Sequence, residues 1–170
     1  MDLRALIRDI PDFPQPGILF RDITPLLASG PGLSRTIDEL AERVAGRPVD
    51  VVAGIESRGF VFATALAVRL GVGMIPIRKM GKLPYDTFRE EYQLEYGTDS
   101  VEIHTDAVRA GDQVLMVDDL LATGGTMGAA CRLVQKAGGN ITCCLFVIEL
   151  EALRGREKLP AVPTQALLAY

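Results

Sequence analysis

The segment VLMVDDLLATGGT, residues 114–126, contains the features that decide the fold. Its first four residues, 114–117, are all apolar, which is typical of a buried strand. Two adjacent aspartates, Asp118 and Asp119, come next, and a loop with two glycines then leads into a helical pattern over 126–139. A strand, a short loop and a helix in this order predict one unit of a parallel α/β sheet.

The same segment indicates which ligand the sheet binds. Ligands of open α/β sheets bind beyond the carboxyl ends of the strands, where we expect Asp118 and Asp119. Glycines let the backbone approach an anion closely, and the free N–H groups at the start of a helix favour a phosphate. Carboxylates accept hydrogen bonds and this loop donates them, so the segment predicts vicinal hydroxyls near a phosphate, as in a ribose phosphate. The alternative is that the aspartates cap a helix and the glycines form an ordinary turn.

Composition narrows the class of protein. The chain has 170 residues, which suits one domain, and its net charge of −4 argues against a general nucleic-acid binder. The N-terminus does not resemble a signal peptide and no apolar run is long enough to span a membrane, so we expect a cytoplasmic protein. Three cysteines and a single histidine, His104, offer no metal-binding spacing, so the cysteines are expected to be reduced core residues. The P-loop and dinucleotide-binding motifs are absent from the sequence.

The rest of the chain supports an α/β fold with a central, mostly parallel sheet flanked by helices. Apolar spacing predicts amphipathic helices over 3–10 and 33–44, separated by an irregular proline-rich segment at 11–32. A strand at 49–55, a buried helix at 60–71 and a strand at 73–79 follow. A polar loop at 79–88 precedes a hairpin at 92–104, and further strands are expected at 114–117, 140–150 and near the C-terminus.

Residues 114–126 resemble the phosphoribosyl-pyrophosphate (PRPP) signature of the type I phosphoribosyltransferases. Five further stretches resemble the adenine phosphoribosyltransferases in the same order, so the resemblance covers nearly the whole chain. They are PDFPQPGILFRDITPLL at 11–27, GIESRGFVFATALA at 54–67, IRKMGKLPYDT at 77–87, LEYG at 94–97 and GREKL at 155–159. Met80 departs from the pattern, since bacterial relatives often carry proline there.

This resemblance implies a type I phosphoribosyltransferase fold in a single domain, residues 1–170. It implies a small N-terminal hood at 1–32 that recognises the base, and a flexible loop and hairpin at 79–104. The implied reaction transfers the 5-phosphoribosyl group from PRPP to adenine, giving AMP and pyrophosphate. The implied cofactor is Mg²⁺, held mainly by PRPP and pyrophosphate rather than by protein ligands. The implied partners are these small molecules and a second copy of the chain in a homodimer, with no nucleic acid and no membrane.

The resemblance also assigns roles to individual residues. The 5′-phosphate is assigned to Ala122, Thr123, Gly124, Gly125 and Thr126, and the ribose hydroxyls to Asp118 and Asp119. Pyrophosphate is assigned to Ser57, Arg58, Arg78, Lys79 and Lys82, and adenine to Phe20 and Arg21. Glu95 is the expected general acid/base, Tyr96 lies in the lid, and Arg58, Asp118 and Asp119 complete the catalytic set. The alternatives are solvated surface charges for the basic residues and Glu95, and simple packing for the segment around Phe20.

Two other functions stay open at this level. The first is a phosphoribosyltransferase for another base, such as hypoxanthine or orotate. The second is a regulator that binds PRPP without catalysis, although the acidic chain lacks a spare helix-turn-helix segment for DNA.

Overall fold

The structure is a computed structural model that describes residues 2–94 and 97–170. The chain forms two compact units, Met1–Glu39 and Leu40–Tyr170, with the boundary inside helix α2 (Gly30–Arg43). Glu95 and Tyr96 lie outside the described residues. No helix in the described part of the chain is both long and apolar enough to cross a membrane.

The first unit contains a 3₁₀ helix, a two-stranded antiparallel sheet and two helices. Their bounds are η1 Leu3–Leu6, β1 Arg8–Pro11, β2 Leu19–Asp22, α1 Thr24–Ala28 and the first part of α2. The predicted helix over 3–10 is wrong beyond Leu6, because Ile7 is extended and residues 8–11 pair with 19–22. The predicted irregular segment at 11–32 is also wrong in part. Pro11 ends β1, Pro14 and Pro16 lie in the loop between the strands, and Pro25 and Pro31 lie in first helical turns. A missing N–H costs little in a loop or a first helical turn, so β2 and α1 can form.

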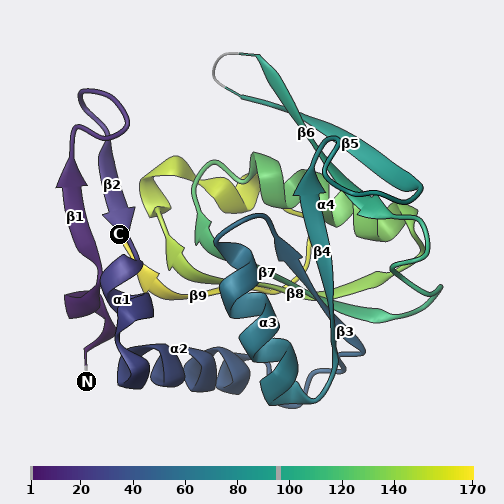
Figure 1. Ribbon diagram of the computed structural model, residues 1–170, viewed down its shortest axis with the longest axis horizontal. Helices are drawn as coiled ribbons and strands as arrows, with labels where there is room; N and C mark the ends of the chain where they lie inside the picture. The colour runs from purple at the N-terminus through teal and green to yellow at the C-terminus, as the bar shows by residue number, and fades with distance from the viewer. Residues whose placement is uncertain (1, 95–96) are drawn as a thin grey trace. The chain divides into compact units, whose positions relative to one another are not determined.

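The second unit contains a seven-stranded sheet in the order β5-β6-β4-β3-β7-β8-β9 (Figure 1). The strands are β3 Val51–Ile55, β4 Gly73–Lys79, β5 Thr87–Gln93, β6 Thr98–His104, β7 Gln113–Leu121, β8 Asn140–Glu149 and β9 Thr164–Ala169. Strands β4, β3, β7, β8 and β9 run parallel, and β5 and β6 form an antiparallel hairpin that joins β4. The predicted mostly parallel sheet is therefore confirmed. A hairpin also forms, but its first strand begins at Thr87, inside the predicted loop at 79–88, rather than at residue 92.

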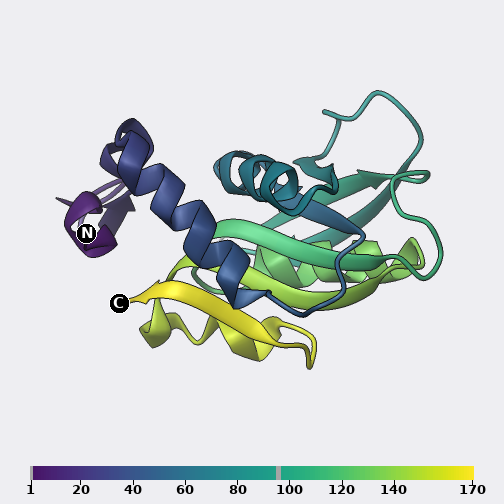
Figure 2. The same cartoon turned by 90° about the horizontal axis from the view of Figure 1, so that it is seen from below.

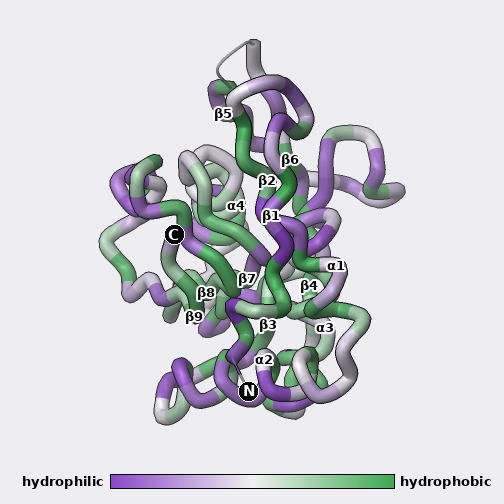
Figure 3. Tube along the Cα trace, turned by 90° about the vertical axis from the view of Figure 1, so that its left-hand side faces the viewer, coloured by the Kyte–Doolittle hydropathy of each residue, from purple (hydrophilic) through white to green (hydrophobic). Residues whose placement is uncertain are grey.

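Helices α3 (Gly59–Leu70) and α4 (Gly125–Lys136) pack against this sheet (Figures 1 and 2). A Cβ atom added at Gly54 would lie 2.5 Å from the Cβ of Ala63, so α3 lies very close to β3. The buried side of α4 joins Ala53 and Met116 in one apolar cluster, and Figure 3 shows hydrophobic residues along β7 and β8. The three cysteines are buried and reduced, as expected, and Cys131 and Cys144 belong to this cluster.

Strand β7 differs from the prediction in its length. It continues past Val117 to Leu121, so Asp118 and Asp119 are part of the strand rather than residues that follow it. The reason is unequal pairing, because β3 pairs with β7 only as far as Val117 while β8 continues to Leu121. Beyond Val117 one side of β7 is therefore without a strand partner in the described sheet, and it is there that the aspartates lie.

Candidate functional site

The two aspartates form a charged pair near the carboxyl end of the inner strand β7. Asp119 is buried and Asp118 is half-buried. The Nε atom of Arg58 lies 2.8 Å from Oδ2 of Asp119, and the Asp119 amide donates a 2.8 Å hydrogen bond to Oδ1 of Asp118. Within the described residues, Oδ2 of Asp119 accepts no hydrogen bond of good geometry. The pair therefore keeps acceptor capacity for a hydroxyl or a cation.

Burial changes the ionisation of this pair. Burial, and then the neighbouring charge of Asp119, raise the pKa of Asp118 well above its ordinary value. Burial also raises the pKa of Asp119, although the Arg58 guanidinium opposes the change. One arginine does not balance two neighbouring carboxylates at a site largely shielded from water, and this disfavours their charged forms. A ligand that donates hydroxyl hydrogens would stabilise the charged pair.

The loop of residues 122–126, called here the phosphate loop, lies next to the aspartates. Gly124 is the N-cap of α4 with a left-handed φ of +80°, and no side chain among the described residues caps this helix. The N–H groups of the first turn are thus available to an anion. A small cavity of about 80 Å³ is lined by Asp118, Leu120, Leu121, Ala122, Thr123, Gly124, Gly125, Thr126 and Met127. The structure brings together all five residues predicted for the 5′-phosphate, with Asp118 beside them.

The basic residues at the end of β4 are organised by Glu56, which the sequence analysis did not select. Its carboxylate accepts hydrogen bonds from the Lys82 ammonium, from the Lys79 amide at 2.8 Å and from Nε of Arg78 at 3.3 Å. Burial alone would raise the pKa of Glu56, but these bonds outweigh it and lower the pKa below its ordinary value. The next two residues are Ser57, reached through a cis peptide, and Arg58. Arg78 and Lys82 therefore converge on the end of β3.

Lys79 makes a different set of contacts. Its ammonium bonds the carboxylate of Asp99 and the hydroxyl of Tyr92, the latter at 2.5 Å. Burial alone would lower the pKa of Lys79, but the hydrogen bonds with Asp99 and Tyr92 raise it. The side chain of Lys79 thus points to the β5–β6 hairpin, whereas those of Arg78 and Lys82 contact Glu56. The five residues predicted for pyrophosphate form two groups in this structure.

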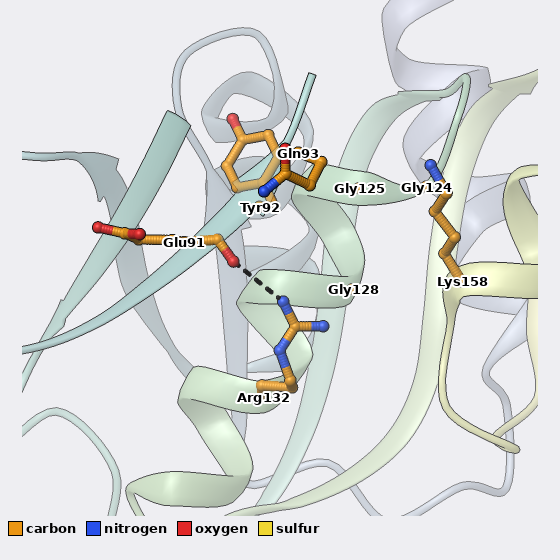
Figure 4. A pocket seen from close by; sticks show the side chains of 8 residues that line it. All are labelled: Glu91, Tyr92, Gln93, Gly124, Gly125, Gly128, Arg132 and Lys158. Atoms are coloured by element: carbon orange, nitrogen blue, oxygen red, sulfur yellow. Dashed lines mark hydrogen bonds between the residues drawn. The ribbon is translucent and has the colours of Figure 1, made fainter. Parts of the chain in front are cut away.

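Tyr92 connects the hairpin with the phosphate loop. A Cβ atom added at Gly125 would lie 3.3 Å from Cδ2 of the Tyr92 ring. A cavity of about 400 Å³ opens here, and Figure 4 shows Tyr92 on its β5 side and Lys158 beyond Gly124. Its lining residues are Glu91, Tyr92, Gln93, Gly124, Gly125, Gly128, Arg132 and Lys158.

The residues predicted for adenine belong to the first unit. Phe20 and Arg21 are both on β2. The Phe20 ring meets Phe13 edge to face with 5.1 Å between ring centres, and Arg21 forms an ion pair with Asp9. Their role toward a base stays a prediction. The same is true of Glu95 and Tyr96, which fall outside the described part of the chain.

Sequence reasoning could have found Glu56. It is an acidic residue at the end of one predicted strand, and two basic residues, Arg78 and Lys79, end the neighbouring predicted strand. Carboxyl ends of parallel neighbours meet at one edge, so a charge pair across them was foreseeable. No comparable signal marked Gly59, whose added Cβ would lie 2.6 Å from Oδ1 of Asp118.

Three comparisons relate this chain to known proteins. The sequence model of the phosphoribosyl transferase domain matches residues 26–162. An adenine phosphoribosyltransferase of Chloroflexus aurantiacus is 56% identical over 169 residues, covering 99% of this chain and 98% of the relative. One from a Cyanothece species is 55% identical over the full length of both chains.

Solved structures give the same result. Adenine phosphoribosyltransferase from Thermoanaerobacter pseudethanolicus superposes with a TM-score of 0.97 at 49% identity, over 99% of this chain and 98% of that one. The Saccharomyces cerevisiae protein, solved with an imino-altritol bisphosphate and adenine, has a TM-score of 0.93 at 42% identity, over 98% and 96% of the two chains.

Proposed function

The chain belongs to the adenine phosphoribosyltransferases of the phosphoribosyl transferase domain family, and from this premise we propose how its residues share the reaction. The enzyme transfers the 5-phosphoribosyl group of PRPP to adenine and releases AMP and pyrophosphate. It serves purine salvage and has the type I phosphoribosyltransferase fold. The assignments of individual residues below are our proposal.

The phosphate loop binds the 5′-phosphate, and Asp118 and Asp119 accept hydrogen bonds from the ribose hydroxyls. The single observation that carries this assignment is the cavity shared by Asp118 and residues 120–127. It combines the uncapped start of α4 with a carboxylate of raised pKa. A ribose phosphate supplies the anion that the helix favours and the donors that the aspartates lack.

Pyrophosphate binds at the neighbouring strand end, through Ser57, Arg58, Arg78 and Lys82. Glu56 holds the last two of these near Arg58. Lys79 reaches the same ligand only if it gives up Asp99 and Tyr92, with which it is bonded here. The role of Lys79 is thus the least direct of the five.

Mg²⁺ fits this chain as an ion held mainly by oxygens of the substrate. Asp118 and Asp119 offer hard oxygen ligands, and in the described structure Oδ2 of Asp119 has the Arg58 ion pair but no hydrogen bond of good geometry. Among the described residues no group of three or more His, Cys, Asp or Glu side chains is arranged to hold a metal. When bound, Mg²⁺ would neutralise the charge of the leaving pyrophosphate.

The reaction passes through an oxocarbenium-like transition state on the ribose, as in other glycosyl transfers. Asp118 and Asp119 then lie beside developing positive charge and stabilise it without rearrangement. Glu95 is our candidate for the general acid/base near the base nitrogens, and Tyr96 for the lid. Phe20 offers an apolar face for adenine, and the Arg21 backbone pairs with its edge.

The same proposal covers the setting of the enzyme. We take residues 1–170 as one functional domain, with a base-recognition hood at 1–32 and a flexible segment at 79–104. We propose a cytoplasmic homodimer.

Steady-state assays with PRPP and each of adenine, hypoxanthine and orotate test the substrate. We expect turnover with adenine, and turnover of another base without adenine would refute the reading. The double variant Asp118→Asn with Asp119→Asn tests the site. Because each asparagine carries no charge and keeps only one acceptor oxygen, we expect turnover to be largely lost while circular dichroism stays that of the folded chain. Near-normal kinetics in the folded double variant would refute the ribose role.

A further inference from the structure

The segment GREK, residues 155–158, forms the 3₁₀ helix η3 and lies directly against the phosphate loop. A Cβ atom added at Gly124 would lie 2.1 Å from the carbonyl oxygen of Gly155. One added at Gly155 would lie 2.3 Å from the carbonyl oxygen of Ala122. Both distances are below any real Cβ contact, so the two backbones touch with no room for a side chain. The phosphate loop is therefore supported from behind by η3.

A third contact extends this support into α4. A Cβ atom added at Gly128 would lie 2.7 Å from the carbonyl oxygen of Lys158. Gly128 also donates a 2.9 Å hydrogen bond to the carbonyl oxygen of Gly124, in the first turn of the helix. The segment thus contacts both the loop and the start of the helix whose N–H groups face the proposed phosphate.

Arg156 fixes the position of η3. Its Nε and its terminal nitrogen each donate a 2.6 Å hydrogen bond to the carboxylate of Glu149, a bidentate pair. A third hydrogen bond of 2.7 Å goes to the carbonyl oxygen of Thr164 on β9. Glu149 is buried and ends β8, opposite Leu121 of β7. Arg156 therefore ties η3 to the end of β8 and the start of β9.

We propose that Arg156 is a positioning residue for the 5′-phosphate site, acting through Glu149 and the Gly155 backbone. The inference rests on the proposed role of the phosphate loop. Arg156 does not act as a ligand, because three of its N–H groups are already committed to Glu149 and Thr164. Its effect is to hold residues 122–124 where the N–H groups of α4 and the loop converge on one anion.

The test compares Arg156→Gln with Arg154→Gln. Each variant removes one positive charge from the same short segment. Arg154 is a matched control because it is exposed and its ion pair with the exposed Glu157 is long, at 3.9 Å. Glutamine at position 156 keeps one donor for Glu149, which protects the fold. Melting curves of all variants are used to choose an assay temperature at which each of them is folded.

We expect Arg156→Gln to raise the KM for PRPP and the dissociation constant of ribose 5-phosphate about tenfold, the loss of about one charge-assisted hydrogen bond. The KM for adenine and kcat at saturation should stay within about twofold, because binding is then uniformly weakened. Arg154→Gln should change none of these. Glu149→Gln should likewise weaken the binding of PRPP and ribose 5-phosphate and leave the KM for adenine and kcat nearly unchanged. The double variant with Arg156→Gln should bind these ligands no more weakly than either single variant, because both residues act through one pair.

Two outcomes would overturn the proposal. One is an unchanged affinity for ribose 5-phosphate in folded Arg156→Gln. The other is an equal change in the constants for PRPP and adenine that Arg156→Lys, which cannot form the bidentate pair, fully restores. Titration with ribose 5-phosphate needs no turnover. It therefore separates failure of this inference from failure of the proposed reaction, which the wild-type assay with adenine reports.

Discussion

Gly59→Ala should damage catalysis far more than it damages the fold. Gly59 is the first residue of α3, and its backbone is compatible with alanine because its φ is not in the left-handed region. The new Cβ would lie 2.6 Å from Oδ1 of Asp118, and 3.2 Å from its Cα. Ordinary contact begins at 3.4 Å, so the carboxylate oxygen must move by about 0.8 Å.

The expected magnitudes follow from this displacement. Overpacking costs about 1–3 kcal/mol, and the better helix propensity of alanine offsets up to about 1 kcal/mol. The net loss of about 0–3 kcal/mol lowers Tm by at most about 12 °C in a chain of this size. A displacement of about 1 Å in a reacting constellation can cost about 100-fold, so we expect kcat/KM for PRPP to fall by about 10- to 100-fold.

The assay is steady-state turnover of adenine and PRPP, with Tm measured on the same samples. Gly30→Ala is the control, because Gly30 is the first residue of α2 and an added Cβ meets no atom within 4 Å. That variant should keep full activity. The geometry requires Asp118 to move in this variant. A folded Gly59→Ala enzyme with kcat/KM within about twofold of the wild type would therefore show that catalysis does not depend on the position of the Asp118 carboxylate.

Two further predictions concern pH and stability at the same edge. Because folding raises the pKa of Asp118, the folded state favours the protonated form of this residue. The resulting contribution to the free energy of unfolding is fully present below pH 3.8, the ordinary pKa, and is lost as the pH rises through the folded pKa. Asp118→Asn should therefore have a higher Tm than the wild type at neutral pH, and its Tm should decrease less as the pH rises. A Tm at neutral pH equal to or below that of the wild type would contradict this prediction. Glu56 has the opposite sign, because its lowered pKa gives stability that is present above 4.5 and is lost as the pH falls through the folded pKa. Glu56→Gln should lower the free energy of unfolding by about 1–2 kcal/mol at neutral pH, or Tm by about 2–8 °C. In a pH series of melting curves, the difference in Tm from the wild type should become smaller in acid. A difference that stays constant with pH would argue against a lowered pKa of Glu56.

The sequence was most informative where periodicity and order decide the structure. The run at 114–117 and the glycines before α4 formed close to where they were expected, and a hairpin formed with its first strand beginning at Thr87 instead of residue 92. Apolar periodicity also predicted a helix at 3–10, but the pairing of residues 8–11 with 19–22 replaced its second half. Local propensity cannot anticipate such pairing, because it depends on a partner strand elsewhere in the chain.

The site divides in the same way. Its central part, Asp118 to Thr126, is continuous in sequence and could be predicted from local chemistry. The contacts of Glu56 with Lys82, and of Arg156 with Glu149, join residues that are separated in sequence. The first pair joins two predicted neighbouring strands and could have been foreseen, whereas the second depends on how the chain turns after β8, which local patterns do not specify. The split between Lys79 and its basic neighbours depends on side-chain direction at the end of β4, and sequence spacing alone does not fix that direction.

The backbone contact between Gly124 and Gly155 also has a consequence for synthesis on the ribosome. The loop that forms the proposed phosphate site is translated before the residues that support it from behind. A nascent chain that ends shortly after α4 has the glycines, the aspartates and the helix start, but not η3. The site can therefore reach its final geometry only after residues 155–158 have emerged and β8 is in place. Binding of a phosphorylated ligand should accordingly appear late in synthesis, as one of the last steps of folding.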